Sequence, residues 1–115
     1  MITDILGKEL CIGDIVIRGV GTNTGNFMIL LIKEINEEQE IRHNYDPNTQ
    51  KYVPYNAKVE KLRFYKVIIK NGKFNKLNKS PIYETAYGLL KFEDPKLLRD
   101  IQDYLVKNHI ELKVQ

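Results

Sequence analysis

The sequence predicts an α+β protein that is mainly antiparallel β, with one amphipathic helix near the C-terminus. Two observations point to this class. Runs of β-branched and aromatic residues alternate with turn-forming residues over most of the chain, and a helical period of apolar residues appears only after residue 94. At 115 residues the chain is expected to form a single domain, residues 1–115, and 43% hydrophobic residues suffice for a core.

The first predicted strand, residues 15–20, follows a sharp turn at Gly13-Asp14. The glycine-rich residues 19–26 predict a polar loop after it. Residues 27–35 are almost continuously apolar, and their length and isoleucine content favour a buried strand over a helix.

A polar turn is expected at residues 36–39, followed by a third strand at residues 40–45. Residues 46–49, Asp-Pro-Asn-Thr, are strong turn formers because proline presets φ and the Asp and Asn side chains bond back to the backbone. A strand at residues 51–55 then returns antiparallel to the third strand. Pro54 confines it to a sheet edge, where a homodimer formed by edge pairing is one expectation.

A second hairpin is predicted around Asn71-Gly72, because both residues tolerate the positive φ of a type I′ turn. Its two strands are the β-rich residues 59–70 and the shorter residues 74–77. Lys70 and Lys73 flank the turn and face each other, so a bound anion would relieve their repulsion. The alternative is that hairpin tips simply tolerate exposed lysines.

A helix is predicted at about residues 95–107, because Asp94 is a suitable N-cap and Pro95 suits the first helical position. Its apolar residues fall on one face of the helix. Alternation at residues 110–114 predicts a last short strand. Residues 82–92 stay ambiguous, since a helical spacing of aromatic and leucine side chains conflicts with a glycine in the segment.

Basic residues concentrate between residues 58 and 79. Eight of them against the single acid Glu60 give this basic window a net charge of +7, whereas the whole chain is +3. Such a window is suited to phosphates or to an acidic protein. The candidate binding residues are Lys58, Lys61, Arg63, Lys66, Lys70, Lys73, Lys76 and Lys79. A solvated face is the alternative, since the excess of lysine over arginine, 14 to 4, is typical of AT-rich coding DNA.

Tyrosine side chains supply the candidate aromatic contacts, because their rings bury large rigid areas and still form hydrogen bonds. Tyr45, Tyr52 and Tyr55 surround the turn at residues 46–49, and Tyr65 lies within the basic window. Rings of this kind contact a protein partner or stack on nucleic-acid bases. The alternatives are a cross-strand tyrosine pair that steadies the hairpin and, for Tyr65, a place in the core.

No catalytic motif is evident, so the chain is expected not to be an enzyme and to need no cofactor or metal. His43 and His109 are the only histidines and lack metal-ligand spacing, while Ser80 lies in no nucleophile motif. Cys11 is the only cysteine, which excludes an internal disulfide. Without a signal peptide or an apolar run of about 18 residues, a cytoplasmic location and no membrane partner are expected.

Residues 4–16 read Asp-Ile-Leu-Gly-Lys-Glu-Leu-Cys-Ile-Gly-Asp-Ile-Val. This stretch resembles the start of small bacteriophage accessory proteins, which open D-x-L-G-x-x-L-x-x-G-D-x-V and continue into an SH3-like or KOW-like curled sheet or β-barrel. The resemblance implies that Leu6 and Leu10 plug one end of a small barrel. It extends over about the first twenty residues, carries over no catalytic residue, and leaves the basic window and the helix unexplained.

Two functions remain open. In the first, a non-enzymatic phage-type binding protein presents the basic window to nucleic acid or to nucleic-acid-handling machinery. In the second, a small phage inhibitor or adaptor binds a host protein, such as a defence nuclease, a CRISPR effector or a polymerase. The tyrosine hairpin matters more than the lysines in this second function, and a protein partner that survives nuclease treatment supports it.

Overall fold

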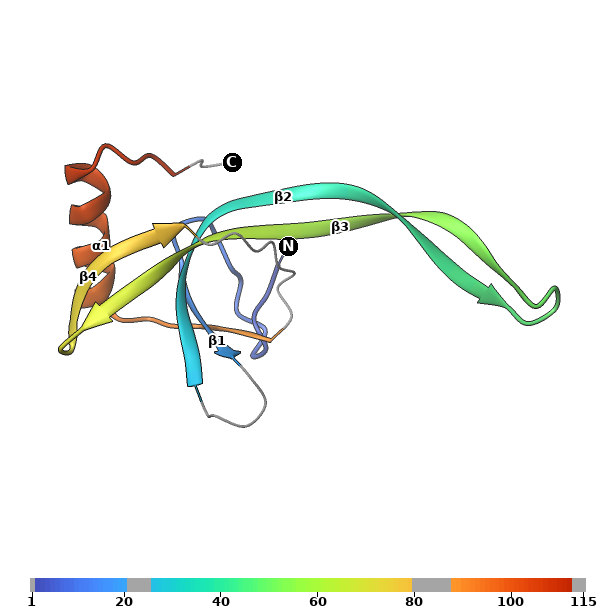
Figure 1. Ribbon diagram of the computed structural model, residues 1–115, viewed down its shortest axis with the longest axis horizontal. Helices are drawn as coiled ribbons and strands as arrows, with labels where there is room; N and C mark the ends of the chain where they lie inside the picture. The colour runs from blue at the N-terminus through green and yellow to red at the C-terminus, as the bar shows by residue number, and fades with distance from the viewer. Residues whose placement is uncertain (1, 21–25, 80–87, 113–115) are drawn as a thin grey trace.

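The computed structural model describes residues 2–20, 26–79 and 88–112 (Figure 1). Its elements are β1 (Ile15–Val20), β2 (Asn26–Asp46), β3 (Lys51–Lys70), β4 (Lys73–Lys79), β5 (Leu89–Lys91) and α1 (Pro95–Lys107). These antiparallel strands and the C-terminal helix confirm the predicted fold class, and the helix has the predicted bounds.

The five named strands form one antiparallel sheet in the order β4-β3-β2-β1-β5. The sheet is curled and open, because no pairing joins β4 to β5 within the described residues. Of the two predicted forms, a curled sheet or a closed barrel, the chain therefore adopts the curled sheet.

β2 and β3 are much longer than the sequence predicts. β2 runs without a break through residues 36–39, so the polar turn expected there is wrong. The strands expected at residues 51–55 and 59–70 are one strand. Glutamates of β2 lie opposite a stretch of β3 that carries lysines, and cross-strand pairs of opposite charge stabilise the ladder where local composition alone favours a turn.

The three local turn and cap signals are confirmed. In the turn between β2 and β3, the backbone N–H of Asn48 donates to Asp46 Oδ1 at 2.9 Å. Asn71 and Gly72 have φ values of 53° and 72°, both in the left-handed region that a type I′ turn requires. Asp94 caps α1 by accepting hydrogen bonds from two backbone N–H groups of the first turn.

Two apolar clusters lie on the two faces of the sheet, because alternate side chains of a strand point to opposite faces. The first cluster packs the sheet against the N-terminal segment and comprises Ile2, Leu10, Val16, Leu30, Ile32, Leu62, Phe64 and Leu89. The second packs it against α1 and comprises Ile15, Leu31, Val67, Leu77, Leu97, Ile101 and Leu105. Adjacent residues such as Leu30 and Leu31 therefore serve different clusters.

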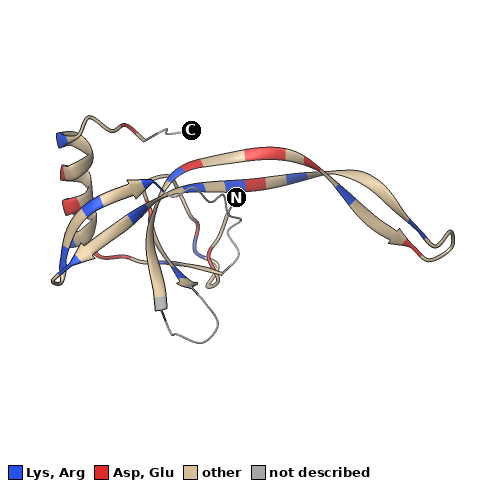
Figure 2. Cartoon of the chain, viewed as in Figure 1, with Lys and Arg blue, Asp and Glu red and all other residues tan. Residues whose placement is uncertain are grey.

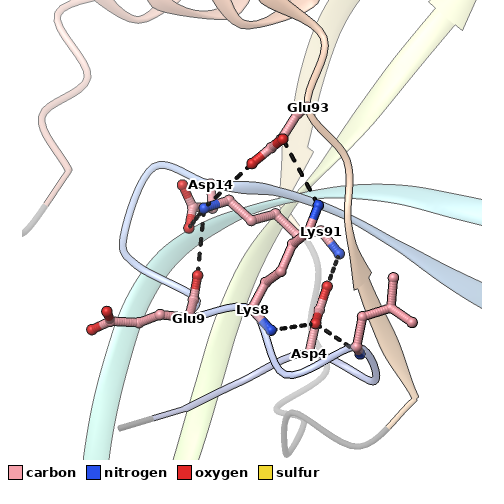
Figure 3. A network of polar contacts seen from close by, with 7 residues as sticks. Asp4, Lys8, Glu9, Asp14, Lys91 and Glu93 are labelled. Carbon is pink, nitrogen blue, oxygen red and sulfur yellow. Dashed lines mark hydrogen bonds and ion pairs between the residues drawn. The ribbon is translucent and has the colours of Figure 1, made fainter.

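A polar network ties the N-terminal segment, residues 2–14, to β5 (Figure 3). The buried Asp4 carboxylate accepts hydrogen bonds at 2.9 Å from the backbone N–H of Lys91 and from two N–H groups of its own turn. The Lys91 ammonium lies 3.5 Å from Asp14. The hydrogen bond from Lys91 is the main reason why the pKa of Asp4 lies below its usual value.

Two finer predictions near the chain ends are wrong. Of the strand expected at residues 110–114, Ile110 and Leu112 form no strand and pack against the cluster beside α1, while residues 113 and 114 lie outside the described residues. Leu6 is 68% exposed and plugs nothing, whereas Leu10 is 3% exposed and belongs to the first cluster. Most of the predicted loop at residues 19–26 and of the ambiguous segment lies outside the described residues.

Past the five-stranded part of the sheet, which we call the body, β2 and β3 continue as a two-stranded ribbon, residues 34–63, which we call the arm. At its base, Leu62 belongs to the first cluster and Ile35 packs against that cluster. Thirteen consecutive residue pairs join its strands. In the described part of the chain, β1 pairs with β2 only as far as Leu31, and β4 pairs with β3 only from Tyr65. Figure 1 shows the arm twisting away from the body. The radius of gyration is 17.3 Å, against about 13 Å for a compact chain of this length, so the arm projects.

The network around Asp4 predicts a specific pH dependence of folding. Hydrogen bonds lower the Asp4 pKa from its usual 3.8, so the ionised carboxylate stabilises the folded state above pH 3.8. This contribution is lost as the pH falls through the lower pKa of the folded state. We expect Asp4→Asn to lower the melting temperature at neutral pH, with a difference from the parent protein that shrinks below pH 3.8.

Thermal unfolding followed by circular dichroism across this pH range tests the prediction. Asp103→Asn, at an exposed position of α1, is the control with the same change of charge, and it should shift the melting temperature little. A difference between Asp4→Asn and the parent protein that stays constant with pH contradicts the assigned role.

Candidate binding surfaces

The basic window is divided between two parts of the molecule. Three of its residues lie on the arm: Lys58, Lys61 and Arg63. The other five lie on the β3–β4 hairpin: Lys66, Lys70, Lys73, Lys76 and Lys79. Figure 2 shows basic and acidic residues mixed along the arm, whereas β4 carries basic residues alone. The structure therefore does not bring the eight residues together on one element.

The three basic-window residues on the arm are paired with glutamates of β2. The contacts are Lys58–Glu37 at 3.7 Å, Lys61–Glu38 at 3.3 Å, Lys61–Glu40, and Arg63–Glu34 at 3.6 Å. Glu40 is the main cause of the raised pKa of Lys61, and Lys61 is the main cause of the lowered pKa of Glu40. With six acidic and five basic residues the arm has a net charge of −1, so it does not attract a polyanion.

Four lysines share one face of the β3–β4 hairpin, which we call the lysine face: Lys66, Lys70, Lys73 and Lys76. The register places Lys70 opposite Lys73, and it places Lys76 opposite Ile68, which lies between Lys66 and Lys70 on β3. Residues directly opposite on antiparallel strands point to the same side, as do residues two apart on one strand. The intervening Val67 packs toward α1, so the lysine face is the side of the hairpin away from α1.

The side chains of the lysine face are exposed to solvent. Within the described residues, none of the four lysines forms an ion pair of the kind seen on the arm. The fifth lysine of the hairpin, Lys79, lies opposite Tyr65 and therefore on the α1 side. The lysine face is thus a cluster of four positive charges, of which only Lys73 also lines the pocket between the hairpin and α1 that contains Asp94, Asp100 and Asp103.

The aromatic rings of the basic window do not accompany the lysine face. Phe64 is 1% exposed and belongs to the first cluster. Tyr65 packs on the α1 side, where the Lys33 ammonium lies 4.7 Å from its ring centroid. Phe74 meets Tyr104 of α1 edge-on, with centroids 5.5 Å apart. Tyr65 is therefore not placed to assist the lysine face.

The tip of the arm carries exposed apolar side chains on both faces. Ile41, Tyr45 and Tyr52 share one face and are 70%, 54% and 69% exposed. Val53 and Tyr55 lie on the other face and are 47% and 40% exposed. The rings of Tyr45 and Tyr52 form a tilted cross-strand pair with centroids 5.4 Å apart, yet both remain largely in water. Exposed apolar clusters of this kind mark contact sites for other macromolecules.

Both strands of the arm have outer edges that pair with no other strand in the described residues. Pro54 lies opposite His43, where β3 pairs with β2 alone, so its predicted edge position is confirmed. Charged side chains along the arm discourage edge-to-edge pairing. A homodimer through this edge stays a prediction.

The side chains able to act as nucleophile or base, a cysteine and a histidine, lie on different parts of the described structure. His43 lies near the tip of the arm, whereas Cys11 is exposed in the N-terminal segment. Ser80 falls outside the described residues. Over residues 2–20, 26–79 and 88–112, no group of three His, Cys, Asp or Glu side chains is placed to hold a metal ion. No helix within those ranges is long and apolar enough to cross a membrane.

The arm is the feature that sequence reasoning missed, and Ile41 and Val53 were missed with it. The sequence does contain a signal for the arm. The acidic residues at 37–40 and the lysines at 58 and 61 lie at nearly equal distances from the turn at residues 46–49, as two strands joined by that turn require. Continuing the hairpin through the acidic stretch pairs these opposite charges.

No family model, no curated protein and no solved structure matches this chain. The bacteriophage relationship and the SH3-like identity suggested by the first residues therefore stay predictions. The two surfaces, the arm tip and the lysine face, are interpreted from their chemistry.

Amide hydrogen exchange is expected to be graded along β2 and β3. A two-stranded ribbon is marginally stable in water, whereas the same strands within the body are buried between two clusters. We expect amides at residues 41–46 and 51–56 to exchange at least about 100-fold faster than those at residues 29–32 and 64–67. Exchange is measured by NMR or mass spectrometry, and residues of the same strands within the body serve as the internal control. Uniform protection along both strands contradicts the description of the arm.

Proposed function

We propose that this chain is a non-enzymatic binding protein that docks onto a protein partner through the tip of its arm, as an adaptor or an inhibitor. One observation carries the proposal: Ile41, Tyr45 and Tyr52 share an exposed face at the end of a projecting ribbon. The resemblance of the first residues to bacteriophage accessory proteins favours a host protein as the partner.

The tip is suited to enter a cleft of its partner. Two paired strands lie about 5 Å apart, so the ribbon is narrow enough for a cleft that excludes the body. Its second face also offers apolar atoms, from Val53 and Tyr55. Full burial of each of these side chains contributes about 1.5–3 kcal/mol. Tyrosine is frequent among the residues that dominate binding energies, because a rigid ring is ordered at little entropic cost.

The charge of the arm favours a protein over a nucleic acid at this tip. Surfaces that stack bases combine rings with a positively charged groove that follows the backbone. Behind the tip lies the shaft of the arm, residues 34–40 and 57–63, which has five acidic and three basic residues, with Glu37, Glu38 and Glu40 close together on β2. A nucleic acid long enough to pass the tip would meet these carboxylates, whereas a protein cleft contacts the tip alone.

Photo-crosslinking in the cells that express the chain tests the proposal. A benzophenone amino acid replaces Tyr52 at the tip in one variant and Gln39, an exposed position of the shaft, in a matched control. We expect the tip variant to form one discrete adduct with another protein, resistant to nuclease. The control should not form it, and Ile41→Ser with Tyr45→Ser should abolish it.

Two results would overturn this function. Equal adducts from the tip and the shaft show that the tip has no special role. An adduct that contains only two copies of this chain makes the arm a self-assembly element and not an adaptor. Once the partner is purified, Tyr52→Ser is expected to weaken its affinity by roughly 30-fold or more, the loss typical of a central interface tyrosine. Lys51→Ser, beside it on β3, should have little effect.

A further inference from the structure

We propose that the lysine face binds the phosphate backbone of double-stranded nucleic acid, without reading its sequence. This surface is separate from the arm tip and does not depend on the function proposed for that tip. Its four lysines are exposed on one side of the β3–β4 hairpin. The hairpin has no acidic residue from Phe64 to Lys79, so nothing in that stretch of sequence offsets its charge.

Within the described residues, the salt bridges of the arm have no counterpart at this face, although the arm also places one like-charged pair, Glu37 and Glu60, directly opposite. On the arm, Lys58 and Lys61 are each matched by a glutamate on the neighbouring strand. On the β3–β4 hairpin, the register instead places Lys70 directly opposite Lys73. Like charges opposite each other destabilise a pair of strands, and an anion bound between them removes that cost.

Protection of a sheet edge does not account for the whole lysine face. Lysines on an edge strand discourage pairing with other chains, which explains Lys73 and Lys76 on β4. Lys66 lies instead on β3 and is flanked on both sides, by Leu30 of β2 and Asn78 of β4. An exposed lysine at an interior strand position has no edge to protect.

The dimensions of the lysine face match a nucleic-acid backbone. Lys66 and Lys70 are four residues apart on one strand, which is about 13 Å, and the facing strand adds a second row about 5 Å away. Phosphates follow each other at about 3.4 Å of helix axis on each strand of a duplex. Four lysines spread over this strip are able to neutralise about four phosphates.

The absence of rings selects the duplex over a single strand. Proteins that hold single strands stack bases on aromatic side chains, and the described rings of the basic window, Phe64, Tyr65 and Phe74, all serve packing instead. A surface that offers charge alone binds best where phosphates are densest, and a duplex carries twice as much charge per length of helix axis as one of its strands.

Binding is measured by fluorescence anisotropy with a short labelled duplex DNA and with oligo-dT of the same length, in the full chain. With four phosphate contacts, the logarithm of affinity should fall with the logarithm of salt with a slope of about −3.6, a loss of roughly 150-fold between about 50 and about 200 mM salt. Duplexes of different sequence should bind alike, and oligo-dT more weakly.

Matched charge variants test which lysines act. Lys66→Gln with Lys70→Gln removes two contacts, so the slope should fall to about −1.8. Lys51→Gln with Lys107→Gln removes the same charge from the arm tip and from the end of α1, and should leave the slope unchanged. Lys66→Arg with Lys70→Arg keeps the charge and should keep the binding, which separates lost contacts from damage to the fold.

The proposal is overturned if Lys66→Gln with Lys70→Gln and the control pair of Gln substitutions change the salt slope equally, because binding then follows net charge alone. Stronger binding of oligo-dT than of duplex also overturns it. A third contrary result is lysine-dependent binding of polyglutamate by a chain that does not bind duplex, which assigns the face to an acidic protein. If Lys73→Gln with Lys76→Gln causes aggregation, and neither this pair nor Lys66→Gln with Lys70→Gln weakens duplex binding, the lysines only protect the sheet.

Discussion

The ladder between β2 and β3 determines both the core and the position of the arm. In the body, Leu30, Leu31 and Ile32 of β2 pair with β3 and supply both apolar clusters. The register then shifts between Ile32 and Glu34, and the same two strands leave the body as the arm. Bulges of this kind bend a strand and increase its twist, which suits the point where the ribbon separates from the sheet. One ladder thus builds the core and positions the arm tip.

Charge placement gives the two ends of the molecule different chemistry. Along the shaft of the arm, glutamates neutralise Lys58, Lys61 and Arg63, which leaves an apolar tip as its distinctive surface. On the β3–β4 hairpin the lysines stay without such partners in the described residues. The two proposed binding modes are compatible, because the arm tip and the lysine face lie on different parts of the molecule.

The sequence predicted what is encoded locally. The turn at residues 46–49, the Asn71-Gly72 hairpin and the cap of α1 each depend on side chains within a few positions of one another, and all three are present. The continuity of β2 depends instead on charges about twenty residues away on β3, so the polar stretch at residues 36–39, taken alone, predicts a turn. The same limit applies to the basic window: its net charge is visible in the sequence, but its division between arm and hairpin follows only from the register.

The central claim is that the ribbon projects from the body in solution, and small-angle X-ray scattering measures this directly. We expect a radius of gyration near 17.3 Å for the monomer, and a distance distribution with a long tail. Removing residues 41–56 and joining the strands with a short turn should shorten that tail. A radius near 13 Å for the full chain, the value of a compact protein of this length, would mean that the ribbon lies against the body and would contradict the account.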